Sequence, residues 1–100
     1  MSSNDFTVVW TNQALINSLK IKEYLLEKFT NREILKFYQQ LSIFEHTVSS
    51  HPEIYPLTSS EKKIRRAVIS RELSVFYRIH NTQIEVLAIF DNRCDLSDWI

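Results

Sequence analysis

The sequence predicts an α+β domain in which a helical hairpin packs on one face of a small antiparallel sheet. The prediction rests on a β-branched, aromatic segment near the start, two successive helical periodicities, and a final run of strand-like segments. The expected order is β-α-α-β-β-β. One hundred residues with 44% hydrophobic content fit a single domain, residues 1–100, with one small core.

The first strand and first helix follow from residues 6–29. Residues 6–10, FTVVW, are short, β-branched and aromatic, which favours a strand. Thr11 and Asn12 are candidate N-cap residues for a helix over residues 13–29. Most apolar side chains of this helix fall in one arc at about 100° per residue, so we expect that face to pack on the core.

A second helix is expected over residues 31–48. Thr30 and Glu33 match a capping box, the pattern of a helix start. A narrow apolar stripe then runs along the segment: Ile34, Phe37, Tyr38, Leu41, Phe44 and Val48. The break between the helices is short, which predicts an antiparallel helical hairpin.

The rest of the chain predicts a loop and then strands. Residues 49–61 hold both prolines with several Ser and Thr residues, so we expect a loop. Strands are expected at residues 63–70, 73–80 and 84–90, and the middle one alternates with period two. Short connections make both pairings antiparallel. The first strand must pair with one of these three.

Composition excludes several classes of function. The chain has no Gly, so it cannot form a Gly-rich phosphate loop or a dinucleotide-binding fingerprint. Its only cysteine, Cys94, has no evident base partner and fits a reducing compartment. His46, His51 and His80 lack metal-ligand spacing, so no metal or other cofactor is expected. No signal peptide or membrane span is evident, and we expect a cytoplasmic protein.

The net charge of zero hides a basic segment from Lys62 to Arg93. It holds seven of the twelve Lys and Arg residues against three acids, which gives a local charge of 7 − 3 = +4. Residues 1–61 carry five bases and seven acids. A sheet that is both apolar and cationic is typical of one buried face and one face for an anionic partner.

The order of elements and four short motifs together resemble the RelE/ParE superfamily of toxins from type II toxin–antitoxin systems. The resemblance covers about residues 6 to 99. The motifs are VVWTNQA at residues 8–14, IRR at 64–66, VFYRI at 75–79 and IEVLAIFDNR at 84–93. None is a signature alone, but their order and spacing are fairly specific for the fold.

The resemblance implies a partner and two alternative targets. RelE-like members cut mRNA in the ribosomal A site, whereas ParE-like members inhibit DNA gyrase. Both are neutralised by a cognate antitoxin whose C-terminal segment wraps the toxin, so a toxin–antitoxin hetero-oligomer is expected. Plasmid stabilisation and RNA binding are associated roles. An inactive member that keeps only the binding surface is the remaining alternative.

The family's nuclease residues match this sequence only in part. Arg93 matches the arginine just after the last strand, and Arg65 or Arg66 could stand for the basic residues of the preceding strand. The middle-strand arginine is replaced by Ser74, and the C-terminal tyrosine by Trp99. Indole can donate a hydrogen bond but cannot serve in acid–base catalysis.

The remaining basic residues are candidate RNA- or target-binding groups. These are Lys62, Lys63, Arg71 and Arg78, to which Trp99 is added. Four of the candidate arginines also have a purely structural interpretation. Arg65 and Arg66 could be edge-strand charges that discourage aggregation. Arg78 could pair with Glu85 across a hairpin, and Arg93 with Asp91 in a local bridge.

Overall fold

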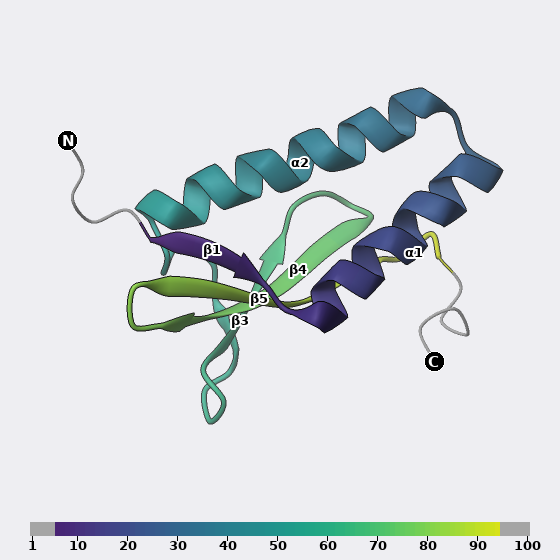
Figure 1. Ribbon diagram of the computed structural model, residues 1–100. Helices are drawn as coiled ribbons and strands as arrows, with labels where there is room; N and C mark the ends of the chain where they lie inside the picture. Colours follow the sequence, from purple (N-terminus) through teal and green to yellow (C-terminus); the bar gives the residue numbers. More distant parts are fainter. Residues whose placement is uncertain (1–5, 95–100) are drawn as a thin grey trace.

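The structure, a computed structural model, describes residues 6–94 and has the expected α+β architecture (Figure 1). Two helices lie on one side of a five-stranded sheet. In chain order the elements are β1 (Thr7–Trp10), α1 (Asn12–Lys28), α2 (Asn31–Ser50), β2 (Leu57–Ser59), β3 (Ile64–Val68), β4 (Leu73–His80) and β5 (Gln83–Asp91). None of the helices in this part of the chain is long and apolar enough to cross a membrane.

The strands lie in the order β1-β5-β4-β3-β2. β1 pairs with β5 in parallel, and the other pairings are antiparallel. β2 lies in the segment predicted to be a loop, residues 49–61, so that prediction is wrong for three residues. β2 covers β3, which is therefore an internal strand. The edge-strand interpretation of Arg65 and Arg66 is wrong for the same reason.

The first helix begins as the sequence predicts. Thr11 is its N-cap, and the Thr11 hydroxyl accepts a hydrogen bond from the Ala14 N–H at 3.2 Å. The same hydroxyl donates to the Val86 carbonyl on β5 at 2.9 Å. One side chain thus caps α1 and fixes the start of the helix on the sheet.

The second helix begins without the predicted capping box. Thr30 is the N-cap, but its side chain makes no capping hydrogen bond. The Glu33 carboxylate does not turn back toward Thr30, because it accepts a hydrogen bond from Arg93 at 3.0 Å. A tertiary contact therefore replaces the local one.

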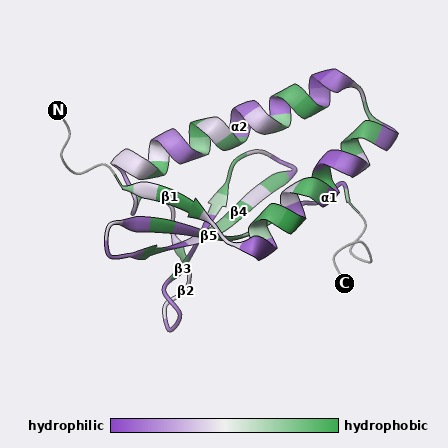
Figure 2. Ribbon diagram, in the orientation of Figure 1, coloured by the Kyte–Doolittle hydropathy of each residue, from purple (hydrophilic) through white to green (hydrophobic). Residues whose placement is uncertain are grey.

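The core lies between the helices and the sheet. α2 buries four residues of the predicted stripe, Phe37, Leu41, Phe44 and Val48, and leaves Tyr38 exposed. α1 buries only Ala14, Asn17, Ile21 and Leu25. The prediction that the whole apolar arc of α1 faces the core is wrong for Leu15, Leu19, Leu26 and Phe29, which are exposed. Figure 2 shows hydrophobic residues along both helices.

Tyr77 joins the sheet, α2 and the loop that follows α2. Its ring packs edge-on against Phe44 at 5.5 Å and Tyr55 at 6.3 Å between centroids. Its hydroxyl donates to the Pro52 carbonyl at 2.7 Å. Burial raises the pKa of Tyr77 to about 12, since the interior disfavours the phenolate.

The Tyr77 environment predicts a defined loss of stability at high pH. Tyr77→Phe should cost about 1 kcal/mol at neutral pH, because the Pro52 carbonyl loses its donor. Between pH 10 and about 12 the unfolded chain releases the Tyr77 proton and the folded chain keeps it, so wild type should lose stability as the pH rises. Urea unfolding of both proteins at about pH 8 and about pH 11.5 measures the difference. The prediction fails if the free energy of unfolding of the Phe variant falls between these two pH values by as much as that of wild type.

The turn between β2 and β3 contains a strained residue, Lys63, whose φ is 59°. Glycine reaches this left-handed region without a Cβ clash, so Lys63→Gly should raise the free energy of unfolding by about 0.5–1 kcal/mol. Lys62→Gly is the matched control, since it removes the same charge from the neighbouring position. Equal effects of the two substitutions in urea unfolding would show that charge, and not backbone strain, is responsible.

Candidate functional site

Arg93 is held by two carboxylates at the end of β5. Its Nε and Nη2 donate to Asp91 Oδ1 and Oδ2 at 2.9 and 2.7 Å, and its Nη1 donates to Glu33 Oε1 at 3.0 Å. The Asp91 side chain is fully buried. The Arg93 Cζ lies 5.2 Å from the centre of the Phe29 ring. The predicted local bridge between Arg93 and Asp91 is therefore present, and Glu33 extends it to α2.

These contacts determine what Arg93 can do chemically. Hydrogen bonds to Asp91 raise the pKa of the Arg93 guanidinium above its already high ordinary value. A permanently protonated group cannot act as a general acid or base at neutral pH. Its positive charge is also neutralised on the helix side of the sheet by Asp91 and Glu33. The observed arrangement is that of a structural tie between β5 and the first turn of α2.

Arg66 lies on the opposite, open face of the sheet. It pairs with Phe76 in the β3–β4 register, its Cζ lies 5.8 Å from the Phe76 ring centre, and its Nη2 is 3.3 Å from the Ser74 Oγ. The sequence resemblance predicts that Ser74 replaces the family's middle-strand arginine. The Arg66 guanidinium, reaching across from β3, contacts that position.

Arg65 points to the helix side, which settles the register that the sequence left open. Its Nη1 donates to the Tyr55 carbonyl at 2.7 Å and to the Glu53 carbonyl at 3.3 Å. Arg65 therefore holds the segment after α2 against the sheet. Adjacent strand residues face opposite sides, so Arg66 alone of the two points to the open face.

The predicted binding residues are spread around the sheet. Lys62 and Lys63 are exposed in the β2–β3 turn, and Arg71 is exposed in the β3–β4 turn. Arg78 pairs with Glu85 on the adjacent strand at 2.6 Å, as the structural interpretation predicted. These cations do not converge on one cavity.

The predicted catalytic set is not assembled on one surface. Arg93 and Arg65 lie on the helix side of the sheet and Arg66 on the open face. Trp99, a predicted binding residue, lies outside the described residues. Between residues 6 and 94, no group of three or more His, Cys, Asp and Glu side chains is placed to hold a metal ion.

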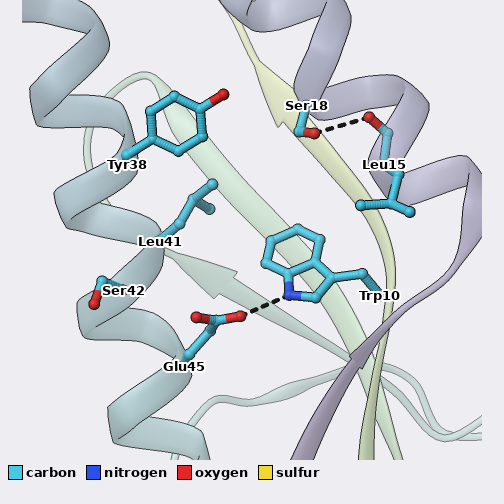
Figure 3. A pocket seen from close by; sticks show the side chains of 7 residues that line it. All are labelled: Trp10, Leu15, Ser18, Tyr38, Leu41, Ser42 and Glu45. Carbon is cyan, nitrogen blue, oxygen red and sulfur yellow. Dashed lines mark hydrogen bonds between the residues drawn. The ribbon is translucent and has the colours of Figure 1, made fainter.

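Sequence reasoning missed a groove between the two helices. Figure 3 shows side chains from β1, α1 and α2 pointing into it. Its volume is about 240 Å³, and it is lined by Trp10, Leu15, Ser18, Tyr38, Leu41, Ser42 and Glu45. Trp10 Nε1 donates to Glu45 Oε2 at 2.6 Å across the groove.

An exposed apolar row on α1 borders this groove. Leu15, Leu19 and Leu26 are 48%, 57% and 54% exposed, and Leu15 is also part of the groove wall. Their spacing of four and seven residues places them on one side of the helix, next to the buried row of Ala14, Ile21 and Leu25. The sequence contained a sign of this exposed row, because the apolar arc of α1 is too wide for all of it to contact one core.

Comparison with solved structures identifies the fold. A chain from the chromosomal ParDE toxin–antitoxin system of P. aeruginosa aligns at 18% identity with a TM-score of 0.73, covering 89% of this chain and 98% of that chain. The chain has the fold of RelE/ParE toxins. The sequence matches no family model and no curated protein.

Two further structures share the RelE/ParE fold. A chain of the Mycobacterium tuberculosis toxin–antitoxin complex RelBE2 aligns at 18% identity with a TM-score of 0.58, covering 87% of this chain and 98% of that chain. A chain of the E. coli DinJ–YafQ toxin–antitoxin complex aligns at 11% identity with a TM-score of 0.56, covering 89% and 94%. Likeness at these identities establishes the fold.

The contacts of Arg93 predict a structural role that can be separated from activity. Arg93→Met should lower the free energy of unfolding by about 3–5 kcal/mol, because buried Asp91 loses its counter-charge. Adding Asp91→Asn should restore part of this loss. Arg71→Met, at an exposed position, is the control and should change stability by less than about 0.5 kcal/mol.

Urea unfolding of these variants measures the effect. An Arg93→Met protein as stable as wild type would contradict the structural role. A double variant less stable than the single one would contradict the proposed dependence on the Asp91 charge.

Proposed function

We propose that this chain is the toxin of a type II toxin–antitoxin system and that it acts by binding its target, without cleaving RNA. The RelE/ParE fold and the sequence motifs support the toxin role, and the three similar structures come from toxin–antitoxin systems. The corresponding target is DNA gyrase, as in the ParE-like alternative. The site of action would be the cytoplasm.

The engagement of Arg93 is the observation that favours binding over cleavage. Attack of a 2′-hydroxyl on the adjacent phosphate needs a proton acceptor, a cation for the developing charge, and a proton donor for the leaving oxygen. Arg93 matches the nuclease pattern best, yet Asp91 and Glu33 already neutralise its charge. Ser74 is a neutral hydroxyl where the pattern has an arginine.

The groove and the apolar row of α1 support an antitoxin partner. An unfolded antitoxin segment must order itself on binding, so it needs apolar anchor positions to offset the lost chain entropy. Leu15, Leu19 and Leu26 provide an exposed apolar edge beside a groove of about 240 Å³. We propose that the antitoxin segment lies along this edge and enters the groove.

Ribosome-dependent mRNA cleavage is the second candidate, and one contact favours it. The Arg66 guanidinium lies 3.3 Å from Ser74 Oγ, so a cation from β3 is present at the position of the missing middle-strand arginine. Arg66 on the exposed side of the Phe76 ring could contact a phosphate or a base. This candidate requires that catalysis proceed without a free Arg93 side chain.

Expression of the chain alone in a bacterium separates the two candidates. We expect growth arrest with intact mRNA, measured by mapping 5′ ends with a translation-blocked message as control, and rescue by the protein encoded next to this chain. Loss of negative supercoiling in plasmid DNA is the expected result for gyrase.

Two results would contradict the proposal. Cuts confined to translated frames, which disappear in an equally abundant Arg66→Ala protein, would establish the nuclease. Normal growth despite accumulation of the folded protein would contradict the toxin role itself.

A further inference from the structure

We infer that the groove between α1 and α2 is a binding site for a cationic side chain, an arginine or lysine of the antitoxin segment. The inference rests on the proposed function, since it specifies the chemistry of that partner. It follows from three properties of the groove: a fixed carboxylate, two aromatic rings and aliphatic walls.

The carboxylate belongs to Glu45, which is partly buried on α2. It is the single charged residue among the seven described residues that line the groove. The Trp10 indole N–H donates to its Oε2 at 2.6 Å, which fixes the carboxylate in the groove. A carboxylate has lone pairs for several donors, so Oε1 can accept from a ligand. The ion pairs within residues 6–94 join Arg78 to Glu85 and Arg93 to Glu33 and Asp91, and none of them involves Glu45.

The aromatic rings come from Trp10 on β1 and Tyr38 on α2. Both side chains point into the space between the helices (Figure 3). The faces of such rings attract cations, most strongly for Trp, and the attraction grows when the cation is partly desolvated. Trp10 therefore contributes both an indole donor to Glu45 and an aromatic surface beside the same carboxylate.

The apolar walls suit the stem of a long basic side chain. Leu15 and Leu41 line the groove from α1 and α2. Arginine and lysine bury their methylene stems on apolar surface while the charged head reaches a polar group. The groove thus matches such a side chain along its length: leucines for the stem, rings and Glu45 for the head.

Two features favour a side chain of a bound segment over a free small cation. Leu15 of the groove wall belongs to an exposed apolar row with Leu19 and Leu26 on α1, which a free cation would leave uncovered. Glu45 also gives the groove a negative charge that no other described residue of its lining offsets, which favours a cationic group of the partner. A partner segment with an isolated cation among apolar residues complements the groove in shape and charge.

A titration followed by the Trp10 indole N–H resonance tests the inference directly. N-acetyl-arginine methylamide is the ligand, and the citrulline analogue, equal in size but uncharged, is its control. We expect the arginine ligand to shift the resonance and to bind about fivefold or more tightly than citrulline. Glu45→Gln should abolish this preference, since the amide oxygen still accepts from Trp10 while the charge is lost. Glu61→Gln, an exposed substitution elsewhere, should leave it unchanged.

Equal binding of the two ligands by wild type, or a preference that survives in Glu45→Gln, would overturn the inference. The affinity of this chain for the neighbouring gene's product distinguishes a failure of the inference from a failure of the proposed function. Glu45→Gln should weaken that complex about tenfold, and Glu61→Gln should not. A complex that forms normally with Glu45→Gln overturns the inference and leaves the toxin role standing. A wild-type chain that binds no such product contradicts the proposed partner, while the arginine titration still decides the chemistry of the groove.

Discussion

The buried charge of Asp91 is the constraint on which the rest of the structure depends. A carboxylate without water must have a counter-charge and hydrogen bonds, and Arg93 supplies both through a bidentate contact. Arg93 then contacts Glu33 in the first turn of α2 and lies beside Phe29 at the end of α1. One ion cluster thus fixes the turn of the helical hairpin to the end of β5.

This anchoring explains why the groove opens where it does. The hairpin turn is tied to the sheet by Arg93, and α2 is held along its length by the buried stripe that ends at Val48. The start of α1 is fixed on β5 by Thr11. Away from the turn, the Trp10–Glu45 hydrogen bond joins β1 to α2, and the space between the helices is incompletely filled, which leaves the groove. In the same cluster, Asp91 and Glu33 neutralise the charge of Arg93, the residue that best matches the nuclease motif.

Local sequence patterns predicted the helices and strands, whereas contacts between residues far apart in the sequence determine the geometry of the candidate site. The period-two alternation gave β4 at residues 73–80, as observed, and the helical periods placed α1 and α2 within a few residues. β2 was not predicted, because a strand of three residues after a proline is too short to show a hydrophobic alternation. The capping box failed because Glu33 binds a residue sixty positions away. No pattern within one segment could report that pair, or the pairing of Trp10 with Glu45.

The most direct test of this account is a crystal structure of the chain bound to the protein encoded next to it. The account predicts a partner segment along α1, with an arginine or lysine between Trp10 and Tyr38 and its charged head at Glu45. It also predicts that Arg93 keeps its contacts to Asp91 and Glu33. A partner bound only to the open face of the sheet, or an Arg93 side chain released from Asp91 and directed toward Arg66, would contradict it.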